Sequence, residues 1–443
     1  MAICNLIAFG MRPLEKIGFS LPVGIGVTTL IMMVFELMGL PLNNTPLLLG
    51  TIGVLSILFG FMGYWKHKGQ ENFLDRLKTT DWKKTLLPVN LGWLLLMACI
   101  FVVVYANVSK TLFWPVFIHD SVNGYDFLAR VIMQEGTFNN SIFDPDYPLY
   151  SPRTLYPPLA PLSFSISYLL GHESAKIVTA LFFVSNALVF YSMLKRQSSH
   201  LAAALFSLIF LITPEFVAFS ALSSPNPICT FYCAMGMLSL YVWYRDGESS
   251  YFNMGMLSIM LALWTRSEAL IFFAGGGFLI LLRSWQTRSF KRLLIFGIAG
   301  VGVFMFWQLY LRHELLVENP DNIIKHFYWD GAKLGRMMER VWKVTFNTQF
   351  YGILVYLFLA TVLVNAYFTV KNREGVVLLS IIFLPWLAYM VIYYQLDTTY
   401  LPDGAVWIES GYKRGLFYFF PLMLFYCANN PIADKIFNHW LKL

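Results

Sequence analysis

Charged residues are scarce in this 443-residue chain. Asp, Glu, Lys and Arg together make up 13% of it, against roughly 25% in soluble globular domains. Most of the chain therefore needs no water-facing side, which excludes an ordinary soluble domain. Hydrophobic residues reach 57% and aromatics 17%, as expected where rings fill helix contacts and mark membrane interfaces. The net charge of +7 lies in short loops between apolar runs, which is typical of topology signals and not of a nucleic-acid-binding surface.

Cysteine is also sparse, and its placement excludes two classes of site. The five cysteines lie in or beside apolar runs, so they do not form a disulfide framework. Cys229 and Cys233 share one helix face, but no further ligand lies nearby in the sequence, which favours packing over a metal site. The chain also lacks a glycine-rich nucleotide-binding fingerprint. No cleavable signal peptide is expected, because the first long apolar run has the length of a retained span.

Long apolar runs dominate the rest of the sequence. A helix needs about 20 apolar residues to cross a bilayer core. The sequence predicts an all-α polytopic membrane protein with about twelve transmembrane helices, of which the pair at 251–264 and 268–282 is short enough to form a thin hairpin instead. The candidate spans are 20–40, 46–65, 88–107, 174–194, 199–219, 227–244, 251–264, 268–282, 292–310, 349–370, 376–395 and 415–430.

The distribution of Lys and Arg predicts the orientation. With the N-terminus in the cytoplasm, inner segments hold 19 of the 32 basic residues and outer segments hold 12, nine of them in the two longest outer loops. The positive-inside rule has least force in long loops. We therefore expect both termini to be cytoplasmic.

Three long outer segments hold 14 of the 25 acidic residues. They are too short for soluble domains but long enough for interfacial helices, which lie on the membrane surface. These outer loops are 108–173, 311–348 and 396–414. The predicted divisions are an N-terminal two-helix membrane extension (1–87), a main transmembrane domain (88–430) and a cytoplasmic tail (431–443).

The first outer loop carries the residues with the clearest chemical potential. Residues 121–135 predict a short amphipathic helix, in which Asp126 and Arg130 pair at i and i+4 and Gly136 is the C-terminal stop. Asp120 stands just before this helix. It can be an N-cap that accepts hydrogen bonds from the first turn, and it can also be a catalytic base fixed at the membrane surface.

A stretch rich in proline and aromatic residues follows at 144–159. Its prolines exclude regular structure. Arg153 and Tyr156 lie within it, and they either order the loop or contact a substrate. The apolar run at 159–171 predicts a helix that is too short to span the membrane and is interpreted as interfacial.

This arrangement resembles the GT-C superfamily of integral membrane glycosyltransferases, which includes protein O-mannosyltransferases and lipid A aminoarabinose transferases. The shared pattern is a span, an outer loop whose acidic residue opens an amphipathic helix ending in Glu-Gly, and then Tyr-Pro-Pro-Leu. Trp264-Thr-Arg-Ser-Glu-Ala-Leu at an outer turn is similar to an Arg-(Pro/Ser)-Glu element of such chains. Gly411-Tyr-Lys-Arg resembles their late Arg-Tyr segment. The resemblance covers roughly residues 88–430.

The chain departs from that pattern in two places. Many members have two adjacent acidic residues in the first loop, whereas this chain has His119-Asp120-Ser121, so only Asp120 matches. Two spans, at 20–40 and 46–65, also precede the one that matches the first span of the family. The sequence indicates no function for them.

The resemblance implies transfer of a sugar from a polyprenyl-phosphate-linked donor to a lipid, glycan or protein acceptor, with membrane lipids as the surroundings. It places the protein in a bacterial inner membrane, with its site facing the periplasm or exterior. The lipid-linked sugar is the donor substrate, no cofactor is implied, and a divalent metal requirement stays open. Asp120 is the implied catalytic base. The implied substrate-binding residues are Arg266, Glu268, Arg414, Lys413, Arg153, Tyr156 and Asp126.

Other interpretations of these residues stay open. Arg266 and Glu268 can pair with each other at a hairpin tip, and Lys413 and Arg414 can be interface anchors. A membrane transporter or lipid-linked glycan flippase is the main alternative function, and a non-catalytic scaffold is a third. An O-antigen-type polymerase or ligase would be closely related to the glycosyltransferase interpretation. Against a transporter, ionisable residues are nearly absent from span centres.

Overall fold

The structure, a computed structural model, describes residues 1–68, 91–116, 120–144, 146, 156–317, 329–371, 373–396 and 408–440. All regular structure in these ranges is helical, as the sequence predicts. The first half contains α1 (Ala2–Ile7), α2 (Pro13–Leu37), α3 (Thr45–Lys66), α6 (Leu91–Phe113), η1 (Ser121–Tyr125), α7 (Asp126–Glu135), η2 (Ser141–Phe143), α8 (Leu159–Leu169), α9 (Lys176–Leu194), α10 (His200–Leu211) and α11 (Pro214–Ser220).

The second half continues in the same way. Its middle elements are α12 (Pro225–Thr230), η4 (Phe231–Met235), α13 (Gly236–Asp246), α14 (Ser249–Leu263), η5 (Ser267–Ala269), α15 (Leu270–Thr287) and α16 (Lys291–His313). The C-terminal elements are α17 (Gly331–Thr345), α18 (Thr348–Tyr351), α19 (Leu354–Lys371), α20 (Arg373–Leu396), η7 (Ile408–Tyr412), α22 (Lys413–Gly415), η8 (Leu416–Tyr418), α23 (Phe420–Ala428), α24 (Pro431–Asp434) and η9 (Lys435–Trp440).

Eight helices in the described ranges are long and apolar enough to cross a membrane, and a ninth span results if α10 and α11 are counted together. The chain is therefore a multi-pass integral membrane protein. The predicted count of about twelve is too high by this measure. The eight helices are α2, α3, α6, α9, α15 with its preceding turn η5, α16, α19 and α20.

The remaining predicted spans are helical, but they are bent, interrupted or short. α10 and α11 meet at an angle of 68°, because Thr213 precedes a proline and its ψ of 118° lies outside the helical range. The run at 227–244 is divided by the π-helical turn η4, and the run at 415–430 by the 3-10 turn η8. α14 has only 15 residues.

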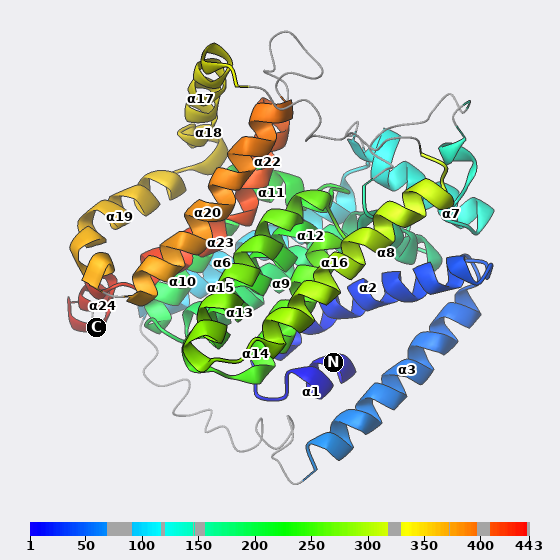
Figure 1. Cartoon of the computed structure of the whole chain (residues 1–443), viewed down its shortest axis with the longest axis horizontal. Helices are drawn as coiled ribbons and strands as arrows, with labels where there is room; N and C mark the ends of the chain where they lie inside the picture. The colour runs from blue at the N-terminus through cyan, green and yellow to red at the C-terminus, as the bar shows by residue number, and fades with distance from the viewer. Residues whose placement is uncertain are drawn as a thin grey trace.

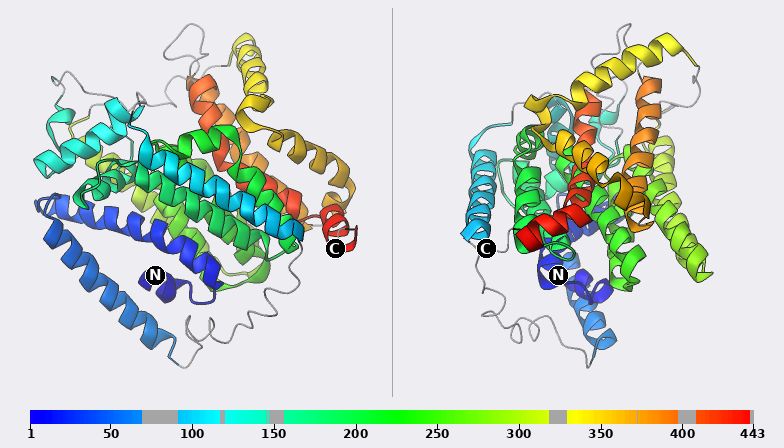
Figure 2. Two further views of the ribbon diagram at one scale, coloured as in Figure 1. Left: turned by 180° about the vertical axis from the view of Figure 1, so that it is seen from behind. Right: turned by 90° about the vertical axis from the view of Figure 1, so that its left-hand side faces the viewer.

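The bundle has two polar ends, which we name by their contents. The loop end carries Asp120, Arg266 and Arg414, and it includes the described parts of the three long predicted outer segments. The terminal end carries Arg196 and Asp246, and both chain termini lie on that side (Figures 1 and 2). The designation of the loop end as non-cytoplasmic remains a prediction from the sequence.

The second helix of the chain is part of the bundle. α2 packs against α9 and α8. Near its end, Glu36 accepts hydrogen bonds from the Thr137 hydroxyl (2.7 Å) and from the amides of Phe138 (2.7 Å) and Asn139 (3.0 Å). The Tyr310 hydroxyl of α16 also donates to it (3.2 Å). α2 therefore anchors the loop after α7, whereas α3 lies at the periphery (Figure 1) with most of its apolar surface exposed.

The predicted helix of the first outer loop is confirmed over Asp126–Glu135, and the preceding turn, Ser121–Tyr125, is kinked at Gly124. α7 ends at Gly136, whose φ of 76° suits glycine. Asp126 and Arg130 pair at 3.0 Å as predicted. The helix predicted at 159–171 forms as α8, but most of it is buried, with α7, α9 and α2 packed against it. The interfacial assignment of this helix is wrong, because neighbouring helices cover its apolar surface.

Two glycines bring the late Gly-Tyr-Lys-Arg-Gly segment against α20. A Cβ atom at Gly415 would lie 1.7 Å from the Tyr389 hydroxyl oxygen, and one at Gly411 would lie 2.7 Å from the Tyr393 hydroxyl oxygen. Any larger side chain would therefore push the segment away from α20. Close packing at these two positions fixes where Arg414 lies along α20, at the loop end.

Candidate active site

A carboxylate and a guanidinium from distant parts of the chain meet at the loop end. Arg414 Nη1 donates to Asp120 Oδ2 at 2.5 Å. Arg414 Nε donates to the Ser410 carbonyl oxygen at 2.9 Å, and its guanidinium carbon lies 5.5 Å from the centroid of the Phe219 ring. The Arg414 and Asp120 side chains remain 21% and 24% exposed. Both groups are therefore partly open to solvent.

The Asp120 side chain does not make the capping hydrogen bond that one interpretation of the sequence expected. Asp120 occupies the N-cap position of η1, but its carboxylate accepts no hydrogen bond from the first turn. Instead, the Ser121 hydroxyl ties the helix start to the Ser223 carbonyl oxygen at 2.8 Å. Gly124 departs from helical geometry inside this turn, with φ −143° and ψ −108°. The N-cap interpretation is therefore wrong, and the carboxylate is directed toward Arg414.

Arg266 lies at the turn between α14 and α15, where it is nearly enclosed. Its Nη2 atom donates to Glu268 Oε1 at 3.0 Å, and its Nη1 atom donates to Asn226 Oδ1 at 2.7 Å. Its guanidinium carbon lies 5.0 Å from the centroid of the Tyr156 ring. Its Nε atom has no hydrogen-bond partner among the described residues. The predicted pairing with Glu268 is confirmed, but Arg266 is only 12% exposed, so this is not a surface pair.

The surroundings of Arg266 favour its charged form. Burial disfavours the charge, but Glu268 and the nearby phenols outweigh burial and raise the pKa of the Arg266 guanidinium well above its usual range. Burial also raises the pKa of the Tyr125 phenol, which lies within electrostatic reach of Arg266 and Asp120. The rings of Tyr125 and Tyr156 stack with centroids 6.1 Å apart. The Tyr156 ring therefore contacts both the Arg266 guanidinium and the Tyr125 ring.

Lys413 is held beside Arg414 by a second carboxylate. Its Nζ atom donates to Glu215 Oε1 at 2.5 Å, and the two side chains are 19% and 15% exposed. The same nitrogen lies 4.4 Å from the centroid of the Phe350 ring. Glu215 stands in the first turn of α11, directly after the bend from α10. This carboxylate, which the sequence placed inside a span, is therefore at a helix start and paired with a cation.

The other predicted binding residues lie in different settings. Both carboxylate oxygens of Asp126 are engaged in packing, because Arg130 Nε donates to one at 3.0 Å and the Tyr168 hydroxyl donates to the other at 2.6 Å. This arrangement joins α7 to α8. Arg153 lies outside the described residues. No cluster of three or more His, Cys, Asp or Glu residues suited to a metal ion occurs in the described ranges.

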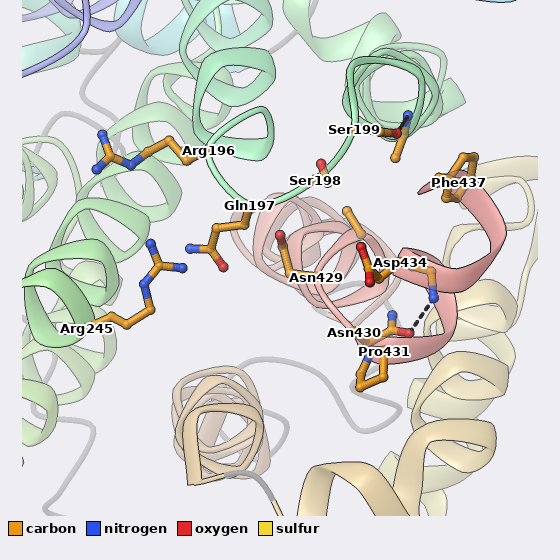
Figure 3. Close-up of a pocket in the computed structure, with 13 residues that line it drawn as sticks. Arg196, Gln197, Ser198, Ser199, Arg245, Asn429, Asn430, Pro431, Asp434 and Phe437 are labelled. Atoms are coloured by element: carbon orange, nitrogen blue, oxygen red, sulfur yellow. Dashed lines mark hydrogen bonds between the residues drawn. The ribbon is translucent and has the colours of Figure 1, made fainter. Parts of the chain in front are cut away.

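A cavity of about 350 Å³ opens at the terminal end (Figure 3). It lies between the turn after α9, the end of α13 and the turn between α23 and α24. Two of its lining residues bind Asp246. Arg196 donates one hydrogen bond of 3.3 Å, and Arg245 donates two, of 2.6 and 2.9 Å, so both carboxylate oxygens of Asp246 are occupied. This cluster joins the ends of α9 and α13. The loop end is the better candidate site, because it combines a partly exposed carboxylate with cations from two separate segments.

The chain was compared with protein families, curated proteins and solved structures. No family model matches it, and neither a curated protein nor a solved structure shows significant similarity. The fold and hydropathy show a multi-pass helical membrane protein.

Three residues of this region were not among the predicted site residues. Asn226 holds Arg266 through its side-chain oxygen, Glu215 holds Lys413, and Tyr125 stacks on Tyr156. Asn226 stands between two prolines in the first turn of α12, in a stretch without charged residues, where an amide is the most polar side chain that the sequence offers. Tyr125 lies within the predicted amphipathic helix at 121–135, and its ring is buried.

Proposed function

We propose that the chain is a glycosyltransferase that moves a sugar from a polyprenyl-phosphate-linked donor to an acceptor hydroxyl at the loop end. The observation that carries the proposal is the contact between Asp120 and Arg414. Such a transfer needs a base for the acceptor proton and a cation for the departing phosphate. A carboxylate and a guanidinium meet here within reach of solvent.

The proposed reaction makes and breaks one bond at C1 of the sugar. The acceptor oxygen attacks C1, and its proton passes to the Asp120 carboxylate. The bond between C1 and the phosphate oxygen breaks, and the lipid phosphate leaves with the electron pair. Attack from the face opposite the phosphate inverts the configuration at C1. Arg414 can exchange its contact with Asp120 for one with the phosphate, because guanidinium binds carboxylate and phosphate with similar geometry.

Arg266 supports the same chemistry from a second position. It is buried and charged, and its Nε–H has no partner among the described residues. A buried guanidinium with an unused donor is suited to an oxygen-rich anion. The position of Arg266 in the sequence also supports this role. It is a basic residue in a short predicted outer turn, and the positive-inside rule does not explain a basic residue there. We propose that Arg266 contacts the donor phosphate.

A transporter or lipid-linked glycan flippase is the second candidate, and the bend between α10 and α11 favours it. Broken helices line substrate sites in many transporters, near the middle of the membrane. Glu215 pairs with Lys413 at this bend. Since Lys413 directly precedes Arg414, however, that pair lies with the other polar groups at the loop end. This placement favours transfer at one face over transport.

The test compares chemistry with transport in vesicles that contain the purified protein, polyprenyl-phosphate sugars and a mixture of lipid, glycan and peptide acceptors that carry free hydroxyl groups. The proposal predicts release of polyprenyl phosphate, which Asp120→Asn lowers by 10²- to 10⁴-fold, the usual contribution of a positioned base. Glu135→Gln is the matched control, because this exposed carboxylate lies on the same helix and binds only Ser141 among the described residues. Passage of the intact lipid-linked sugar across the vesicle without release would instead identify a transporter.

A further inference from the structure

Helix α17 presents one buried and one exposed apolar face. Met337, Val341 and Val344 are buried, and the helix packs against α20 and η7. Met338 and Trp342 lie on the other apolar face and are 41% and 65% exposed. The contacts within the protein therefore account for only one of the two apolar faces.

A row of basic side chains runs along the other edge of the exposed side of the helix, roughly 150° round the helix axis from Met338 and Trp342. Arg336, Arg340 and Lys343 recur at intervals of four and three residues, which places them along one side of the helix. Arg336 and Lys343 are exposed and Arg340 is half-buried. Glu339 stands among them and pairs with Lys343 at 2.7 Å. The row therefore keeps an excess of positive charge.

We propose that this exposed surface of α17 binds the anionic phosphate headgroups of the membrane leaflet at the loop end. Trp beside an apolar neighbour is typical of the interface between headgroups and hydrocarbon. Arg and Lys at that depth attract anionic phosphates. Figure 2 (right) shows α17 lying across the ends of the spans instead of continuing one of them. A soluble acidic partner fits less well, because binding through the basic row alone would leave Trp342 in water.

The surface is connected to the candidate active site by a hydrogen bond between side chains. The last residue of α17, Thr345, shares a hydrogen bond of 2.7 Å with the Tyr412 hydroxyl, to which Trp386 Nε1 of α20 also donates at 3.2 Å. Tyr412 directly precedes Lys413 and Arg414. Headgroup binding by α17 would therefore set the depth of these two cations relative to the lipid phosphates. The headgroup proposal itself does not depend on the reaction proposed above.

Fluorescence quenching by brominated lipids tests the proposal. The full chain and its Trp342→Phe variant are reconstituted in phosphatidylcholine vesicles containing increasing fractions of brominated phosphatidylglycerol or brominated phosphatidylcholine. The difference between the two proteins isolates the emission of Trp342 from that of the other tryptophans. We expect half-maximal quenching of the Trp342 emission at a mole fraction of brominated phosphatidylglycerol about fivefold lower than that of brominated phosphatidylcholine. This is the effect of one basic side chain at an anionic surface.

Two further variants separate headgroup recognition from simple proximity. A variant with Arg336→Gln, Arg340→Gln and Lys343→Gln should be quenched equally by both lipids, and it should fold because none of these side chains is buried. Arg312→Gln, an exposed cation in the last turn of α16, should keep the preference. Equal quenching of the wild type by both lipids would overturn the proposal. Absence of quenching by either lipid would also overturn it and would show that Trp342 faces water.

Discussion

Asp120 and Arg414 are 294 residues apart in the sequence, and their side chains meet at 2.5 Å. The contact joins the first predicted outer loop to the last one. It depends on the close approach of Gly415 to Tyr389, since this approach fixes the segment that carries Arg414. The proposed base and the proposed phosphate ligand are therefore positioned by one packing arrangement.

A double-mutant cycle measures whether these two residues act as one unit. Asp120→Asn and Arg414→Gln should each lower the rate of sugar transfer strongly. The double variant should be little worse than the poorer single variant, because residues that act together are not additive. Transfer rates per folded molecule, measured with all four proteins, check this. Fully multiplicative losses would show that the two residues act independently.

Arg266 and Glu268 should differ in their effects on donor use. Arg266→Gln should weaken donor binding about ten- to a hundredfold, because a hydrogen bond to a charged group contributes roughly 1.5–3 kcal/mol. Glu268→Gln should do less, or should tighten binding, because it removes a carboxylate that competes with phosphate for the guanidinium. Donor affinity per folded molecule is the measurement. If both variants damage folding equally and leave that affinity unchanged, Arg266 has only a structural role.

Tyr412→Phe should destabilise the protein by about 1–3 kcal/mol, because Trp386 Nε1 loses its acceptor and Thr345 loses its partner. Thermal unfolding in detergent measures this change. Tyr356→Phe is the control, since its phenol is 46% exposed and bonds only the Phe346 carbonyl among the described residues. A loss in the control as large as in Tyr412→Phe would refute a special role for Tyr412.

The Tyr412 hydroxyl should also make the stability of the folded protein depend on pH. Burial raises the pKa of Tyr412 to about 12, against the opposing hydrogen bonds of Thr345 and Trp386. The unfolded phenol ionises near pH 10, so the folded protein binds the proton more tightly. This contribution to stability is complete below pH 10 and is lost between pH 10 and 12. The stability difference between wild type and Tyr412→Phe should therefore shrink over that interval, and an unchanged difference would contradict the assignment.

Cysteine labelling tests the orientation of the bundle. Gln134 is exposed at the loop end and Ser289 is exposed between α15 and α16 at the other end. In a background with Cys99→Ser, which removes the one exposed cysteine, a membrane-impermeant maleimide should label Gln134→Cys in intact cells. Ser289→Cys should react only after permeabilisation. The reverse pattern would invert the predicted topology.

The local features of the site could be predicted from the sequence. The helix after Asp120 follows from apolar periodicity, its end at Gly136 from the conformational freedom of glycine, and the pairing of Arg266 with Glu268 from their spacing. Each of these depends on residues a few positions apart. The span count was less accurate, because hydropathy detects an apolar run but not the break at Pro214, the irregular turns η4 and η8, or the early end of α14.

Features that depend on tertiary packing could not be predicted. No local pattern brings Arg414 to Asp120, or Asn226 to Arg266. The burial of α8 depends on α2, a helix outside the region of the family resemblance. Glu36 also acquires its role only when the loop after α7 folds back onto α2.

Binding of polyprenyl phosphate tests the central claim most directly, because this lipid is the common product whatever the sugar. The purified protein in lipid nanodiscs should bind it, with Arg414→Gln and Arg266→Gln each about ten- to a hundredfold weaker. Arg312→Gln, a cation at the same end outside the proposed site, should bind as the wild type does. Equal binding by the wild type and by a variant lacking both Arg266 and Arg414 would contradict the account.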